Sequence, residues 1–213
     1  RLPINNSSSR WINPPNGGFL FMIIWQGNIS IPDSLKSLIF KRIEDNHIDK
    51  KKFYTSYLEG FGSTTFADVL VPYYGDIIDG IMKDLGMYKR SKYYYNLWVQ
   101  MYNSKTDTHG PHSHFGGTEI ISFTHILNCS EQKCFYFLDN DDNKIYPEHQ
   151  SKGDMFAWPA WMLHGVDNVI DPTLNRLVIS GNISLKDYYG GNSDTSVTSN
   201  DDGSGHVTWD VIE

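Results

Sequence analysis

The chain has 213 residues, of which 39% are hydrophobic, 14% aromatic and 20% charged, a composition typical of a globular domain that excludes a fibre or a disordered chain. The formal net charge is −7, and no stripe of Lys and Arg is present to neutralise phosphates, so we expect no binding to nucleic acid. No apolar run approaches the roughly 20 residues that cross a bilayer, so we expect no membrane segment and a cytoplasmic protein.

The N-terminal part, residues 1–92, is predicted to hold a lead-in and elements that pack on a later core. The first 18 residues are rich in Asn, Ser, Pro and Gly, which predicts irregular structure. The apolar run Phe19–Trp25 then predicts a strand. This part therefore supports the fold rather than forming a separate domain.

Two helices are expected after this strand. Asp33 or Ser34 can cap the first, whose apolar residues follow the helical period until the helix ends near Asn46. The second extends from Phe66 to Leu85, and Pro72 should kink or split it because proline removes a hydrogen-bond donor. We expect the two helices to form one layer of packing.

From residue 93 the pattern changes to alternating aromatic and β-branched residues, which predicts consecutive antiparallel strands. The expected strands are Tyr93–Tyr102, Glu119–Leu127, Cys134–Leu138, Asp154–Trp158, His164–Val169 and Arg176–Ser184. The fold class is therefore mainly β with flanking helices (α+β), with a jelly-roll or barrel core over residues 93–189. Residues 190–213 are mostly polar and predict a mobile acidic tail.

Two cysteines are too few for a disulfide framework. Cys129 and Cys134 could face each other across a tight hairpin, but two free thiols are the expectation.

Histidines are concentrated in one short segment that contains His109, His112 and His114. Residues two apart in an extended segment project to the same face, so His112 and His114 can both reach one metal ion. A third ligand must come from elsewhere in the chain. His164 follows His112 by 52 residues and lies near the start of another predicted strand. We call His112, His114 and His164 the histidine triad.

Arg176 follows His164 by 12 residues and begins an apolar strand. An isolated arginine that leads into a core strand needs an anionic partner, and a carboxylate bound through two hydrogen bonds is the natural one. Each element alone has an ordinary explanation: a structural histidine, a chance His-x-His pair, or an arginine that pairs with Asp171 or Glu119. The complete order of these elements is much more specific than any of them.

That order resembles the iron(II)- and 2-oxoglutarate-dependent dioxygenases, and most closely their prolyl-hydroxylase-like branch. The resemblance covers roughly residues 66–184. The residues that match the motifs of that branch are Trp98, Gln100, His112, His114, Gly153, Pro159, Trp161, His164, Arg176 and Asn182.

The resemblance implies a double-stranded β-helix, a jelly roll of the cupin type, with iron on the histidine triad. It also implies that Arg176 binds the distal carboxylate of 2-oxoglutarate and that Tyr102 is placed to hydrogen-bond the same carboxylate. Strand alternation puts Ser180 on the face of Arg176, which makes it a further cosubstrate candidate. The implied reaction uses O₂, hydroxylates a C–H bond of an amino acid, a peptide or a protein (prolyl residues included), and releases succinate and CO₂.

The chain departs from this family at His114, where the usual triad has a carboxylate. Halogenating relatives have a small residue there to admit halide, so the imidazole disfavours halogenation. Asp107, Glu119 or His109 is an alternative source of a ligand.

Two other functions use the same histidines. Three histidines and an open position are the ligand set of a catalytic zinc in hydrolases and lyases, and a cupin-like metal-binding protein or cofactor-free dioxygenase would leave Arg176 structural. The aromatic residues Phe115, Trp158 and Trp161 can position a substrate, but core packing is an equal explanation for Trp158.

Overall fold

The computed structural model describes residues 23–57, 64–87, 93–106, 108–114 and 119–185. These residues form two helices and ten strands. The helices are α1 (Asp33–Asn46) and α2 (Thr64–Asp84). The strands are β1 (Trp25–Asn28), β2 (Tyr54–Thr55), β3 (Tyr93–Tyr102), β4 (His109–His112), β5 (Glu119–Asn128), β6 (Phe135–Leu138), β7 (Lys144–Ile145), β8 (Asp154–Pro159), β9 (His164–Val166) and β10 (Arg176–Leu185).

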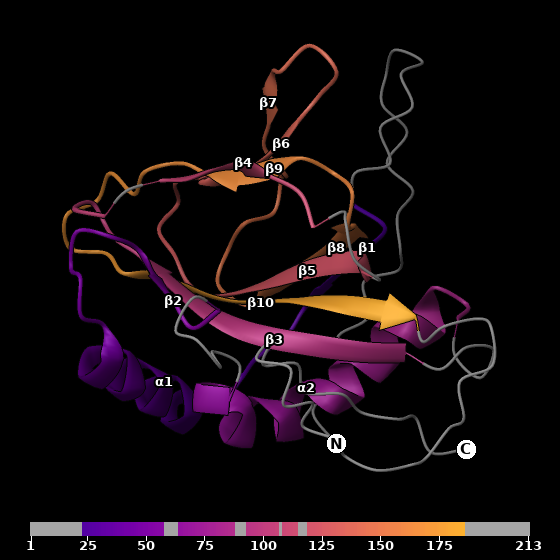
Figure 1. Cartoon of the computed structure of the whole chain (residues 1–213), viewed down its shortest axis with the longest axis horizontal. Helices are drawn as coiled ribbons and strands as arrows, with labels where there is room; N and C mark the ends of the chain where they lie inside the picture. The colour runs from indigo at the N-terminus through magenta and orange to yellow at the C-terminus, as the bar shows by residue number, and fades with distance from the viewer. Residues whose placement is uncertain (1–22, 58–63, 88–92, 107, 115–118, 186–213) are drawn as a thin grey trace.

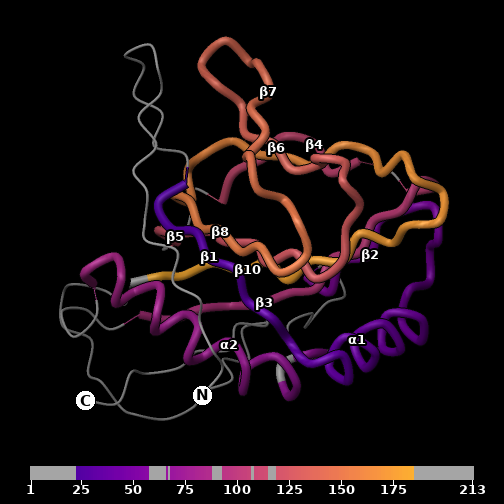
Figure 2. The backbone as a smooth tube through the Cα atoms, turned by 180° about the vertical axis from the view of Figure 1, so that it is seen from behind, coloured from indigo at the N-terminus to yellow at the C-terminus, as the bar shows by residue number. Residues whose placement is uncertain are grey.

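The strands form two antiparallel sheets that face each other. The larger has the order β1-β8-β5-β10-β3-β2, and the smaller has the order β4-β9-β6-β7. In Figure 1 the two helices lie below the six-stranded sheet and the four-stranded sheet lies above it. Figure 2 shows the same three layers from behind, with β7 on a hairpin that extends away from the body. The mainly β fold with flanking helices is thus confirmed.

Two apolar cores follow from this layering. The core between the helices and the large sheet contains Ile39 of α1 and Ile78 of α2, both fully buried. The core between the two sheets is strongly aromatic and includes Phe135, Phe156 and Trp158. Because side chains alternate along a strand, β3, β5, β8 and β10 of the large sheet each contribute to both cores.

The first helix has the expected bounds but a different cap. Neither Asp33 nor Ser34 is the N-cap: the N-cap is Pro32, which makes no side-chain cap hydrogen bond. The Pro32 carbonyl instead accepts hydrogen bonds from the N–H groups of Leu35 and Lys36. Asp33 lies in the first turn, where its negative charge suits the helix dipole and where it pairs with Lys36 at 2.5 Å.

The second helix continues through Pro72 without being split. The strand predicted at Phe19–Trp25 overlaps β1 only at Trp25: Ile23 and Ile24 are not in a strand, and residues 19–22 lie outside the described part. Trp25 pairs with Ala157 of β8, so pairing with an existing strand fixes β1 despite its poor intrinsic strand propensity.

The six strands expected after residue 93 are all present, with ends shifted by a few residues at most. The exception in length is β9, which ends at Val166 rather than Val169. The pattern predicts neither β2 nor β7, because two residues are too short to show a period. The lead-in over residues 1–18 and the tail over residues 190–213 lie outside the described residues.

Cys129 and Cys134 are both free thiols, as expected. Neither described helix combines the length and the apolar character that crossing a membrane requires.

Candidate metal centre

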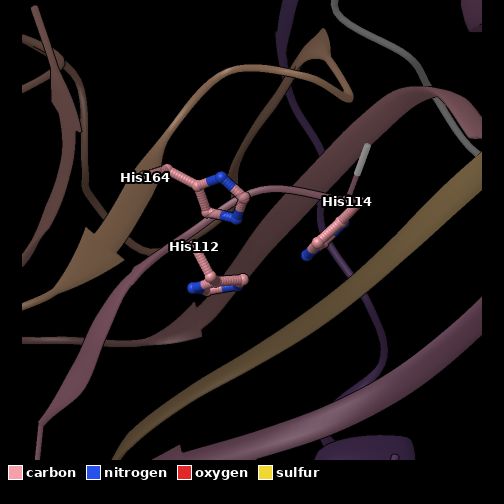
Figure 3. Close-up of side chains that lie close together, drawn as sticks. All are labelled: His112, His114 and His164. Atoms are coloured by element: carbon pink, nitrogen blue, oxygen red, sulfur yellow. The ribbon is translucent and has the colours of Figure 1, made fainter. Parts of the chain in front are cut away.

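The structure brings the histidine triad together between the two sheets. Their potential ligand atoms all lie within 4.8 Å of one another, and the three rings surround one common space in Figure 3. His112 at the end of β4 pairs directly with His164 at the start of β9. His114 lies just beyond β4, where its backbone N–H donates to the Ala160 carbonyl at 2.9 Å.

Each triad histidine has its Nδ1 atom occupied by a hydrogen bond. His112 donates from Nδ1 to the Gly110 carbonyl and His164 to the Met162 carbonyl, both at 2.9 Å. Since a carbonyl oxygen can only accept, Nδ1 carries a proton, and in the neutral ring Nε2 keeps its lone pair. This is the hydrogen-bonding pattern that orients histidine ligands of metals.

His114 obtains the same tautomer from side chains. Its Nδ1 donates to the Asn182 amide oxygen at 2.5 Å and lies 2.9 Å from the Ser122 hydroxyl. Ser122 in turn donates to the same Asn182 oxygen at 2.9 Å. Because that oxygen accepts both bonds, the proton of the neutral His114 ring lies on Nδ1 and its Nε2 keeps a lone pair.

Burial favours neutral rings throughout this cluster. It lowers the pKa of His112 and of His114, and it lowers the pKa of His164 well below its ordinary value. A metal ligand must be the unprotonated imidazole. The electrostatics of the protein therefore keep the triad in the form that binds a cation at neutral pH.

Two of the alternative ligands proposed from the sequence, His109 and Glu119, do not belong to the group of described residues that could hold an ion. That group consists of the histidine triad. The His109 ring stacks on His112 at a centroid distance of 4.0 Å, and its Nδ1 lies 3.2 Å from the Tyr102 hydroxyl. Asp107 lies outside the described residues.

A cavity of about 350 Å³, counting its opening, contains the triad. Arg176, Val178 and Ser180 of β10 all line it, as strand alternation predicts. The other described lining residues are Trp98, Gln100, His109, His112, His114, Phe123, Thr124, Phe135, Trp158, His164 and Val166.

Arg176 is 2% exposed, and in the described part of the chain neither of its Nη atoms has a hydrogen-bond partner. Burial lowers the pKa of its guanidinium, yet arginine remains protonated in proteins. Its closest described aromatic contact is the Tyr102 ring, 5.6 Å from the guanidinium carbon. A buried cation without an anion is costly, so this group fits a ligand that brings a carboxylate.

Ser180 belongs to a polar network on the cavity wall that sequence reasoning did not assemble. Its hydroxyl donates to the Gln100 side-chain oxygen at 3.1 Å and lies 3.2 Å from the Thr124 hydroxyl. Gln100 matches one of the motifs in the sequence, whereas Thr124 carries no signal beyond its place on a strand. The expected contact of Tyr102 with the cosubstrate stays a prediction, because its hydroxyl here contacts His109.

The aromatic residues suggested for substrate positioning separate in the structure. Trp158 is 2% exposed, lines the cavity and packs on His164 with ring centroids 5.0 Å apart. Trp161 is 59% exposed and does not line the cavity. Phe115 lies outside the described residues.

No protein-family model matches the chain, and no curated protein matches it. Solved structures do match. A Pseudomonas putida prolyl-4-hydroxylase has 11% sequence identity and a TM-score of 0.51 over 76% of this chain and 92% of that chain. SnoK, a non-heme alpha-ketoglutarate-dependent carbocyclase from nogalamycin biosynthesis, has 8% identity and a TM-score of 0.52 over 75% and 78%. A Trichoplax adhaerens prolyl hydroxylase, solved with a hypoxia-inducible-factor peptide, has 10% identity and a TM-score of 0.50 over 75% and 82%.

The chain therefore shares the fold of iron(II)- and 2-oxoglutarate-dependent oxygenases, prolyl hydroxylases included. The sequence identities are too low to carry more than the fold. The resemblance drawn from the motifs is confirmed at this level.

Proposed function

We propose that the chain is an iron(II)- and 2-oxoglutarate-dependent oxygenase that hydroxylates a C–H bond of an amino acid, a peptide or a protein. Its two facing sheets would then be the halves of a double-stranded β-helix. The same fold recurs in the oxygenases that it resembles, but the residues of the cavity carry the functional argument.

One observation carries the proposal: a neutral three-histidine cluster and a buried arginine without an anion line the same cavity. The triad offers three nitrogen ligands, which suit iron among other transition metals. Arg176 offers two N–H groups to a carboxylate. A 2-oxo dicarboxylate satisfies both, because one end can bind a metal and the other end an arginine.

The protein contributes binding, orientation and exclusion of water. Asn182 and Ser122 orient His114, and backbone carbonyls orient the other two ligands. Arg176 fixes the far end of the cosubstrate. When bound, iron and 2-oxoglutarate supply the oxidation, in which O₂ converts the C–H bond to C–OH and 2-oxoglutarate to succinate and CO₂.

A zinc hydrolase explains less of the cavity. Such an enzyme needs three histidines and a water molecule, and it would leave the buried charge of Arg176 without a role. The described lining residues also include no Asp or Glu to act as a general base. The oxygenase accounts for the triad and the arginine together.

Anaerobic titration of the Fe(II)-loaded protein with 2-oxoglutarate tests the proposal. We expect the weak visible charge-transfer band that a 2-oxo acid gives when it chelates iron(II). His164→Ala should abolish the band. His149→Ala, which changes an exposed histidine outside the cavity, should leave it intact. A folded, iron-bound wild-type protein without the band would contradict the cosubstrate assignment.

Release of succinate in air, measured with amino acids and peptides as candidates, then identifies the substrate. Proline-containing peptides are the first choice because two of the similar structures are prolyl hydroxylases. Cytoplasmic residence stays a prediction from the sequence.

A further inference from the structure

Trp158 lies at the metal end of the cavity. It pairs with Ser122 across β8 and β5, and Ser122 pairs with Asn182 of β10. These two partners are the residues that orient His114. The Trp158 ring also packs edge-on against His164. Trp158 thus packs on His164 and is a cross-strand neighbour of the residues that orient His114.

The indole N–H of Trp158 is buried, and no acceptor for it exists within the described ranges. Trp25 shows the usual arrangement in this protein, since its indole N–H donates to the Asp84 carboxylate at 2.9 Å. A buried donor without an acceptor forfeits the hydrogen bond that it makes with water in the unfolded chain. Core packing explains the ring of Trp158 but not its nitrogen.

Apart from the free Nε2 atoms of the triad, the cavity-lining residues have fully buried, unpartnered polar atoms that are all donors. Among the described lining residues, those buried without a partner are Trp158 Nε1 and the two Nη atoms of Arg176. The same residues include no carboxylate. A ligand that satisfies this set must therefore be rich in acceptors.

The two groups of donors come from different ends of the large sheet. Trp158 is aligned, through Ser122 of β5, with Asn182 of β10. Asn182 follows Arg176 by six residues along that strand. Their strand positions place one donor near the triad and the other toward the start of β10. A ligand with an acceptor group at each end matches this layout better than a single small anion.

We propose that Trp158 is a cosubstrate-binding residue whose indole N–H donates to the 2-oxo-acid end of 2-oxoglutarate, while Arg176 binds the distal carboxylate. This assignment rests on the proposed function. It gives the buried nitrogen a partner and adds a directional donor beside a ligand set that carries no charge. Phenylalanine at this position would keep an aromatic ring and lose only the donor and part of the ring volume.

The test measures binding by calorimetry in the Zn(II)-loaded protein, because zinc has no redox chemistry and allows no turnover. The probes are 2-oxoglutarate and 2-oxobutyrate, which has the 2-oxo-acid end but lacks the distal carboxylate. Trp158→Phe should weaken both by a similar factor of about ten or more, as expected for a hydrogen bond to a charged group. Arg176→Met should weaken 2-oxoglutarate only.

Trp161→Phe is the matched control, because it makes the same change at an exposed residue three positions along the chain. It should bind both probes as the wild type does. Zinc affinity is measured in parallel and should be similar in all these variants except for small changes from packing against His164.

Equal affinity of wild type and Trp158→Phe for both probes would overturn the assignment and leave the proposed function intact, since the indole would then donate to water. Failure of the Zn(II)-loaded wild type to bind 2-oxoglutarate would overturn both. If Trp158→Phe does not fold, the indole ¹H–¹⁵N resonances of the wild type decide. We expect one buried indole signal to shift with either probe, and no such shift would overturn the assignment.

Discussion

The two faces of the six-stranded sheet bury histidine in opposite ways. On the helix side, His125 of β5 is completely buried and uses both ring nitrogens: Nδ1 accepts from the Tyr74 hydroxyl at 2.6 Å and Nε2 donates to the Ile29 carbonyl at 3.0 Å. On the cavity side, each triad histidine uses only Nδ1. His164 is buried like His125, whereas His112 and His114 are half-buried. An unused nitrogen alone does not make a candidate ligand, because the buried His47 also leaves Nδ1 without a partner among the described residues. The triad is distinguished by ligand atoms that all lie within 4.8 Å of one another.

Two arginines on the opposite sides of the large sheet differ in whether they have a carboxylate partner. Arg42 of α1 makes two hydrogen bonds to the Asp68 carboxylate, at 2.6 and 2.8 Å, on the exposed side of the helices. Arg176 is buried and, within the described part of the chain, lacks such a partner. Arg42 is therefore neutralised within the chain, whereas Arg176 lines the cavity and has no carboxylate among the described lining residues.

The largest effect on metal affinity is expected from substitutions of His114, which test whether it is a metal ligand or a structural histidine. His114→Ala should reduce metal affinity severely, because one of three ligands is lost. His114→Asp supplies an oxygen donor from the same position and should retain iron, with partial turnover because the shorter side chain moves the metal. Elemental analysis of the folded variants measures both.

A carboxylate ligand would give the reverse result. If Glu119 or Asp107 held the metal instead, His114→Ala would keep near-normal iron content, and Glu119→Gln or Asp107→Asn would empty the site. The same elemental analysis on these two variants therefore completes the test.

The next effect concerns Arg176. Arg176→Met should raise the dissociation constant for 2-oxoglutarate by roughly a hundred-fold or more, since losing one partner of a buried charge pair costs about 3 to 5 kcal/mol. Unfolding of the ligand-free variant should show equal or greater stability, because an uncompensated buried charge has been removed. A ligand-free variant that is markedly less stable would indicate a structural arginine.

A smaller effect is expected from Asn182, which acts through His114. Asn182→Ala should lower metal affinity by about 10- to 100-fold, the usual cost of losing an outer hydrogen bond to a histidine ligand. Asn128→Ala is the control, since its amide bonds only to the Asn175 carbonyl at an exposed position. Equal metal titrations for the two variants would show that Ser122 alone orients the ring.

The sequence predicts the strands well because each alternates between two buried faces. Along β10, Arg176, Val178 and Ser180 face the cavity, while Ile179 packs in the helix-side core. The period of two is therefore visible in the residues themselves. β1 is missed because its position depends on β8, which no local pattern reveals.

The candidate site likewise contains residues that the sequence predicts and residues that it does not. The triad and Arg176 are found from spacing, since metal ligands and a carboxylate-binding arginine are recognisable residue types. The bond from His114 to Asn182 joins residues 68 positions apart, and an asparagine is too common to signal it. The orphan N–H of Trp158 is invisible in the sequence, because it depends on which acceptors the fold places nearby.

The smallest effect on the metal site is expected from substitution of His125. This substitution should change the free energy of unfolding rather than metal affinity. Burial lowers the pKa of His125 to about 4 from 6.5, so between these pH values the unfolded chain binds a proton that the folded chain does not. Its contribution to stability is thus present above pH 6.5 and is lost as the pH falls toward 4.

His125→Leu should cost about 1–3 kcal/mol at pH 7, since Tyr74 and Ile29 lose a partner. Because leucine does not titrate, urea unfolding of metal-free protein should show this deficit shrinking as the pH falls from 6.5 to 4, with metal affinity unchanged at pH 7. A deficit that stays constant with pH, or a loss of metal at pH 7, would show that the two faces of the sheet are not independent.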